Sequence, residues 1–108
     1  MLPNRRERRQ AAAAHRRQTQ DLRNTIKRLE ARIESASNAV KALDATLADP
    51  VTYETVSTQR LQELIAERAA SQRDLGAAES DWLHKQEELE VVVALAKADV
   101  DLDAQDLS

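Results

Sequence analysis

The chain has 108 residues, of which 32% are charged and only 2% aromatic, with one glycine and no cysteine. So few large apolar side chains exclude a thick globular core, and the composition is typical of long helices or a coiled coil. The absence of cysteine excludes disulfide and thiolate chemistry and is compatible with a cytoplasmic location. The longest apolar run, residues 91–96, is too short for a transmembrane helix.

The net charge of −3 conceals a strong asymmetry along the chain. Residues 29–108 contain seven basic and seventeen acidic side chains, a balance of −10, whereas residues 1–28 have a balance of +7. A concentration of cationic charge at one end indicates an anionic partner. The nine basic residues of this segment are Arg5, Arg6, Arg8, Arg9, Arg16, Arg17, Arg23, Lys27 and Arg28.

The first 20 residues contain helix formers but almost no large apolar side chain. Asn4 followed by Glu7 predicts a capping box, which would start a helix close to Arg5. A segment with helix propensity but no apolar face can project as a helix, fray or be disordered. We therefore expect residues 1–20 to form a basic extension or linker.

A heptad pattern begins at Leu22 and predicts a long helix that pairs with another helix. Apolar residues follow one another at alternating spacings of four and three as far as Leu47. With Ile26 at position a of the heptad, the pattern includes eight core positions before it stops. These are Leu22, Ile26, Leu29, Ile33, Ala36, Val40, Leu43 and Leu47.

The tip of a helical hairpin is predicted at residues 49–57, between two apolar repeats. Pro50 lacks an amide hydrogen and disfavours helix at the residue before it, so the arriving helix must end near Asp49. Asp49 can then cap a short new turn with Pro50 in its first position. Ser57 or Thr58 can cap the returning helix.

The returning helix has a noisier apolar pattern, in which we expect a drift of register near Arg68 and Ala69. Gly76 marks either a position where the first helix approaches closely or a position where the returning helix is less stable. The pattern fades after Val93, so residues 99–108 are expected to form a frayed acidic tail. The apolar positions are Leu61, Leu64, Ile65, Ala69, Leu75, Ala78, Trp82, Leu83 and Leu89.

Two helices joined by a short tip must lie antiparallel, so residues 21–98 predict a monomeric coiled-coil hairpin in an all-α fold. Pairing Leu47 with Leu61 places Leu43 opposite Ile65. The same register places Ile26 opposite Trp82, which would then close the open end of the hairpin as a clasp. A parallel dimer through the first heptad stripe is the competing design, and the Pro50 break argues against it.

Five short segments form a pattern along the chain: Leu47-Ala48-Asp49-Pro50, Tyr53, Ala78-Glu79, Trp82-Leu83 and Glu87-Glu88-Leu89. In these segments the chain resembles one known domain, the C-terminal coiled coil of ABC-F ATPases, which are soluble ABC proteins that act on ribosomes. The arginine-rich start, with Arg16-Arg17 before Leu22, is more similar to the YheS branch than to the Uup branch. The resemblance implies an accessory domain of a parent that binds ATP and Mg²⁺ elsewhere, since a chain whose only glycine is Gly76 has no phosphate-binding loop.

No motif predicts catalysis, a metal or a small-molecule substrate. His84 with Glu87 and Glu88 lies on one helical face, which is most simply a solvated face, and the carboxylate pair Glu63 and Glu67 follows from helical spacing alone. For the basic segment, the alternatives are a helix that is merely cationic, an anionic membrane surface, and a nucleic-acid backbone. We expect a non-catalytic domain that binds RNA or the ribosome, with DNA as a second candidate. The rival is a structural or protein-interaction coiled coil.

Overall fold

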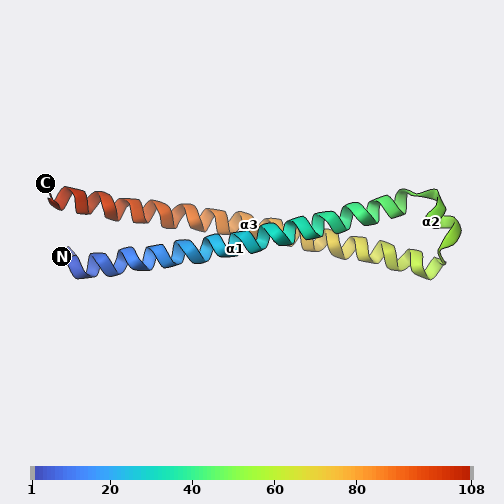
Figure 1. Ribbon diagram of the computed structural model, residues 1–108, viewed down its shortest axis with the longest axis horizontal. Helices are drawn as coiled ribbons and strands as arrows, with labels where there is room; N and C mark the ends of the chain where they lie inside the picture. Colours follow the sequence, from blue (N-terminus) through green and yellow to red (C-terminus); the bar gives the residue numbers. More distant parts are fainter. Residues whose placement is uncertain (1, 108) are drawn as a thin grey trace. The chain divides into compact units, whose positions relative to one another are not determined.

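The computed structural model describes residues 2–107, apart from the side chains at positions 103, 106 and 107. Its three helices are α1 (Arg5–Ala48), α2 (Pro50–Thr55) and α3 (Thr58–Leu107), and the described residues contain no strand. Helix α1 packs against α3, and the short α2 joins them (Figure 1). The all-α class predicted from the heptad pattern is confirmed.

The chain divides into two compact units, and each contains one part of α1 and one part of α3. The terminal unit consists of the described residues of Met1–Lys27 and Leu83–Ser108. The tip unit is Arg28–Trp82, which includes α2. In each unit the two helical segments run side by side in opposite directions (Figure 1).

Helix α1 begins with the predicted capping box. The Glu7 amide donates to the Asn4 side-chain oxygen at 2.8 Å, and the Asn4 amide donates to the Glu7 carboxylate at 3.2 Å. These two bonds satisfy amides that have no partner within the helix. The segment from Arg5 to Gln20 is helical. Its composition had allowed a projecting helix, a fraying helix or disorder.

The eight heptad positions from Leu22 to Leu47 are all buried or half-buried, as predicted. The same alternation of spacings continues toward the N-terminus through Thr19, His15, Ala12 and Arg8, which are half-buried. The first 20 residues are therefore not an extension beyond the paired helices. Small and polar side chains occupy seam positions there, and an apolar pattern cannot reveal a seam built from them.

The tip has the predicted cap. Helix α1 ends at Ala48, and Asp49 has an extended backbone with φ −81° and ψ 120°. The Asp49 carboxylate accepts the Val51 amide at 3.0 Å, and Pro50 begins α2. These features match the preference for aspartate as an N-cap and for proline in the first helical position.

Helix α2 is attached to the end of α1 by two side-chain hydroxyls. Buried Thr52 donates to the Thr46 carbonyl at 2.6 Å, and Tyr53 donates to the Leu47 carbonyl at 2.7 Å. Both carbonyls belong to the last turn of α1, where carbonyls have no partner within the helix. The Ser57 hydroxyl then accepts the Arg60 amide at 3.1 Å and caps α3.

Helix α3 keeps one heptad without the expected drift near Arg68 and Ala69. Its seam follows Leu64 and Arg68, while Ile65 and Leu83 are each 53% exposed. The seam position that the expected pairing with Leu43 assigned to Ile65 is therefore taken by Leu64, which is buried. The buried and half-buried seam positions are Leu61, Leu64, Arg68, Ser71, Leu75, Ala78, Trp82, Lys85, Leu89, Val92 and Ala96.

Helix α3 extends to Leu107, so the segment expected to be a frayed acidic tail is helical over residues 99–107. Residues of this segment pack with the first residues of α1 in the terminal unit. Pairing of the two helices thus continues well beyond Trp82. The expectation that Trp82 closes an open end was wrong, because it assumed that pairing stops where the apolar stripe of the first helix begins.

Ion pairs join the two helices inside the tip unit. Arg32 bonds to Asp74 and lies 4.0 Å from Asp81, and Arg68 bonds to Asp44. The hydrogen bond from Arg32 lowers the pKa of Asp74, and the same bond raises the pKa of Arg32. These groups are exposed to water, so they select the register more than they stabilise the fold.

Gly76 lies inside α3 with an ordinary helical backbone, and a Cβ atom built on it would meet nothing within 4 Å. The close approach considered from the sequence is therefore excluded. We expect Gly76→Ala to raise the free energy of unfolding by about 1 kcal/mol, because alanine restricts the unfolded chain and adds helix propensity. Thermal unfolding followed by circular dichroism measures this, and a lower melting temperature would contradict it.

Candidate nucleic-acid interface

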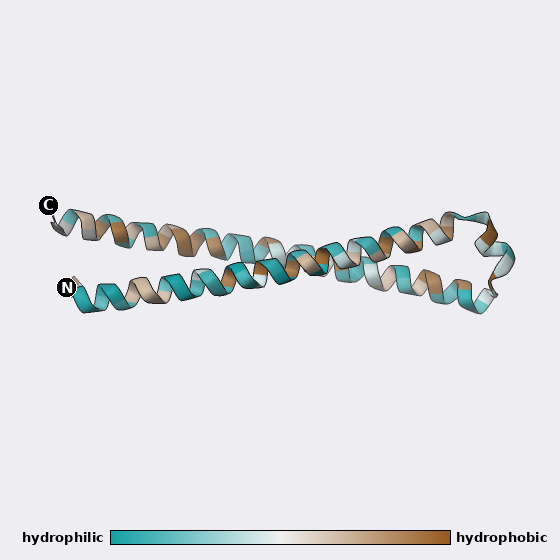
Figure 2. Cartoon of the chain, in the orientation of Figure 1, coloured by the Kyte–Doolittle hydropathy of each residue, from teal (hydrophilic) through white to brown (hydrophobic). Residues whose placement is uncertain are grey.

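All nine basic residues selected from the sequence lie on α1. Eight belong to the terminal unit, and Arg28 belongs to the tip unit. Eight of the nine side chains are exposed, and Arg8 is half-buried. Figure 2 shows the N-terminal part of α1 as predominantly hydrophilic.

Helical geometry arranges the basic side chains of the terminal unit in rows. An α-helix turns by about 100° per residue, so residues seven apart lie almost directly above one another. On this geometry five basic residues fall within an arc of about 40°, beside the seam. They form what we call the arginine row, which consists of Arg5, Arg9, Arg16, Arg23 and Lys27.

Two more cations, Arg6 and Arg17, lie on the side of α1 that faces away from the seam. The two acidic residues of this segment, Glu7 and Asp21, fall on the flank opposite the arginine row. The charge of α1 is therefore segregated around its axis. This arrangement produces a positive strip that continues along about six turns of helix.

The cations of the arginine row make no ion pair with a carboxylate among the described residues. In contrast, Arg32, Arg60, Arg68 and Lys85 each bond to an acidic side chain. Cations without a carboxylate partner keep their charge available for an external anion. The arginine row thus combines exposure, regular spacing and an unneutralised charge.

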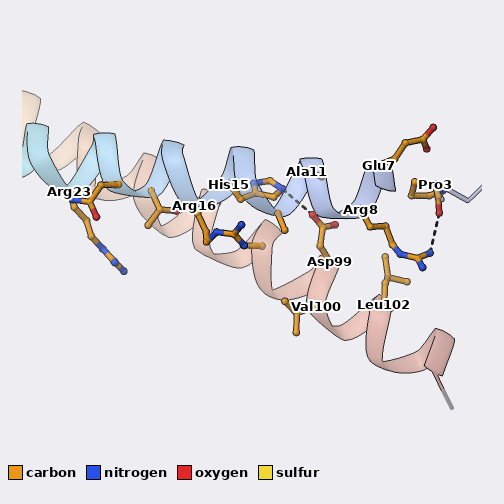
Figure 3. Close-up of a pocket in the computed structure, with 14 residues that line it drawn as sticks. Pro3, Glu7, Arg8, Ala11, His15, Arg16, Arg23, Asp99, Val100 and Leu102 are labelled. Carbon is orange, nitrogen blue, oxygen red and sulfur yellow. Dashed lines mark hydrogen bonds and ion pairs between the residues drawn. The ribbon is translucent and has the colours of Figure 1, made fainter. Parts of the chain in front are cut away.

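Arg8 differs from the other predicted contact residues. It occupies a seam position, and its guanidinium donates to the Pro3 carbonyl at 3.1 Å (Figure 3). Its Nε atom is buried. These observations assign Arg8 to the structure of the N-terminal turn, so we remove it from the surface available to a phosphate backbone.

A groove of about 580 Å³ lies between α1 and α3 in the terminal unit. It exists because the seam is lined there by small side chains, which leave space between the helices. The His15 imidazole and the Asp99 carboxylate meet at 3.0 Å across it (Figure 3). The apolar pattern of the sequence does not predict this groove, although the continuation of the heptad through Ala12 and Thr19 could have indicated it. Its other lining residues include Arg16, Gln20, Arg23, Ala96, Val100 and Leu102.

The remaining acidic and histidine candidates lie on the exposed surface of α3. Glu63 and Glu67 both accept from the Arg60 guanidinium, at 3.2 and 3.0 Å, so the pair is part of a surface ion network. Among the described residues, no cluster of histidine and acidic side chains could hold a metal ion, and His84 lines a shallow hollow with Glu87 and Glu88. No helix in the described part of the chain is long and apolar enough for a membrane crossing.

The residues selected as structural have clear positions. Asp49, Pro50 and Tyr53 form the tip, and Trp82 lies on the half-buried seam of α3.

Comparison with models of protein families, with curated proteins and with solved structures found no match for this chain.

Proposed function

We propose that this chain is a non-catalytic accessory domain that binds a nucleic-acid backbone, RNA in the first place, through the arginine row of α1. On this proposal the two helices form an antiparallel coiled coil that displays the row. The observation that carries it is the alignment of Arg5, Arg9, Arg16, Arg23 and Lys27 on one exposed face without carboxylate partners. Regularly spaced cations contact phosphates without reading bases, so binding would tolerate most sequences.

The similarity of the tip and of the Trp82-Leu83 segment to ABC-F ATPases gives this proposal a cellular setting. In that setting the domain would act in the cytoplasm and help a translation-linked ATPase to engage ribosomal RNA. Catalysis and the binding of ATP and Mg²⁺ would belong to the parent protein.

Binding of the full chain to a labelled 20-nucleotide oligouridine tests the proposal. We expect affinity at 25 mM salt and a steep decline as salt rises. About six phosphate contacts give a log-log slope near −4 to −5, because each contact contributes roughly −0.7 for single strands and −0.9 for duplex DNA. Fluorescence anisotropy measures the slope. Absence of any affinity for RNA or duplex DNA at 25 mM salt would overturn the proposal.

Substitutions test this surface better than a truncation does. Deleting the first 20 residues would remove the segment of α1 that packs against the end of α3, where Val100 and Leu102 are already exposed. The truncated chain would then expose additional apolar surface, and its binding could not be compared with that of the full chain.

A further inference from the structure

Helix α3 exposes large apolar side chains in the terminal unit. The stretch of α1 from Arg5 to Asp21 contains no valine, leucine, isoleucine, methionine or aromatic residue that could cover them. Figure 2 shows several hydrophobic bands on the C-terminal part of α3. The exposed large apolar side chains of α3 between Leu89 and Asp103 are Val91, Val93, Leu95, Val100 and Leu102.

Helical geometry divides these five side chains between two sides of α3. At about 100° per residue, Val91, Leu95 and Leu102 fall within an arc of about 40°. Val93 and Val100 lie about 160 to 180° from the centre of that arc, and Figure 3 shows Val100 and Leu102 pointing in opposite directions. The arc lies about 110° from the seam with α1, so α1 leaves it open. We call Val91, Leu95 and Leu102 the apolar row, and they are 59%, 53% and 53% exposed.

The apolar row has an acidic edge on the side that faces away from α1. Glu87 and Asp101 lie on this edge, at about 60° and 100° from the centre of the row. Both side chains are exposed. Among the described residues, neither forms an ion pair with a cation, so their charges remain available to an external partner.

The other side of the row also has an acidic border, which belongs to α1. A shallow hollow of about 440 Å³ brings Val91 together with Gln18 of α1. Gln18 lies within about 60° of Glu7 and Asp21 around the axis of α1. These two carboxylates therefore belong to the flank of α1 that borders the row. The hollow is lined by Gln18, His84, Glu87, Glu88, Val91 and Val92.

Three nearby cations do not remove this charge. Lys85 is a half-buried seam residue whose ammonium donates to Glu88 at 3.1 Å, so it neutralises Glu88 alone. Lys97 lies about 140° from the centre of the apolar row. The guanidinium of Arg8 donates to the Pro3 carbonyl at 3.1 Å. The apolar row is therefore an exposed apolar face with acidic edges.

We propose that the apolar row binds an amphipathic helix of a partner protein, with basic residues on both sides of the apolar stripe of that helix. From Glu87 to Leu102 the row and its edge extend about 22 Å along α3, which a helix of three heptads can cover. The apolar stripe of the partner would pack on the row. Its lysines or arginines would meet Glu87 and Asp101 on one side, and Glu7 and Asp21 on the other.

The charge pattern favours this occupant. Acidic edges oppose a nucleic-acid backbone and an anionic membrane surface. A second copy docked symmetrically through the same face would bring acidic edges together. A copy docked through its arginine row would make a heterologous contact, which continues into open chains unless the rotation closes. The inference is independent of nucleic-acid binding, because the arginine row lies on the opposite flank of α1.

The test uses the full chain and two labelled 21-residue peptides of three heptads, each with leucine at a and d. One peptide has lysine and the other has glutamate at both flanking positions, so like charges keep each from pairing with itself. At 50 mM salt and pH 8, where histidine side chains are ordinarily neutral, fluorescence anisotropy measures the affinities. We expect the lysine peptide to bind at least tenfold more tightly.

Reversing the charge of the acidic edge should reduce this preference. We expect Glu87→Lys with Asp101→Lys to lower the ratio of the two affinities at least fivefold. Glu30→Lys with Glu34→Lys is the control for net charge, since both side chains are exposed on α1 in the tip unit. Equal reductions in the two variants would show that net charge and not the acidic edge attracts the peptide, which would contradict the inference.

Leu95→Gln with Leu102→Gln should weaken binding of the lysine peptide at least tenfold and leave oligouridine binding unchanged. Val93→Gln with Val100→Gln is the matched control, because both pairs are exposed, lie on α3 and are separated by one heptad. Glutamine has good helix propensity, so both variants should keep the helical circular dichroism of the wild type. We expect the control to bind the lysine peptide like the wild type.

Further results would overturn the inference. The lysine peptide could fail to bind or bind no better than the glutamate peptide, or the control could lose as much affinity as Leu95→Gln with Leu102→Gln. Sedimentation could show assemblies of the chain that Leu95→Gln with Leu102→Gln dissociates, which would assign the apolar row to a second copy. A matching loss of oligouridine binding in that variant would count against a separate peptide site. Failure of the wild type to bind oligouridine would refute only the proposed function.

Discussion

Replacing Arg9, Arg16 and Arg23 with glutamine is expected to weaken oligouridine binding about 100-fold at 0.1 M salt and to flatten the salt slope by about 2 to 3 units. Each arginine that neutralises a phosphate releases counterions, so each loss removes roughly 0.7 to 0.9 from the slope. Glutamine keeps the length and helix propensity of the side chain. The melting temperature should therefore change little, because all three side chains are exposed.

The matched control removes the same charge from other surfaces. Lys41, Arg73 and Lys97 are exposed and, within the described part of the chain, bond to no carboxylate. Replacing all three with glutamine should reduce the slope by less than 1 unit. If the two triple variants lose the same affinity, then net charge and not the arginine row governs binding. Unchanged binding in the arginine-row variant would remove the row from the interface.

The largest effect on stability is expected at Trp82. Trp82→Ala should lower the free energy of unfolding by about 3 kcal/mol, because it removes the largest side chain from the seam and leaves a cavity. Tyr53→Ala should cost about 1 kcal/mol, since the ring is 56% exposed and its hydroxyl makes one hydrogen bond to the Leu47 carbonyl. Chemical denaturation followed by circular dichroism compares the two variants.

The variant Trp82→Phe distinguishes the contribution of the aromatic ring to stability from that of the indole N–H. The indole Nε1 is buried without a hydrogen-bond partner among the described residues, so the N–H contributes a desolvation cost. Phenylalanine keeps most of the apolar area, and we expect its stability to lie close to that of the wild type. Equal losses for Trp82→Ala and Tyr53→Ala would show that Trp82 does not pack in the seam.

Local signals in the sequence predicted local structure well. The Asn4 and Glu7 capping box, the Asp49 cap with Pro50 after it, and the Ser57 cap all follow from side chains that bond to amides within three residues. These interactions need no distant partner. The eight apolar core positions from Leu22 to Leu47 could also be predicted, because the spacing of apolar residues along the chain shows them directly.

The register of α3 required the structure because its seam contains polar residues. Arg68 and Lys85 occupy core positions of the heptad, where their stems are half-buried and their charged groups reach the Asp44 and Glu88 carboxylates. A prediction of the seam from apolar side chains alone misses such positions. It selects Ile65 and Leu83 instead, which are exposed. Polar seam residues thus produced the false drift of register.

The sequence by itself determined the helices, the break at Pro50 and the segregation of charge along α1, because each depends on neighbours in the chain. Only the tertiary structure decided what the first 20 residues do. Their alanines and arginines have no apolar face that could predict a partner, yet they pack against the end of α3. Pairing of small side chains leaves a groove instead of a filled core, and that space depends on two segments that are distant in sequence.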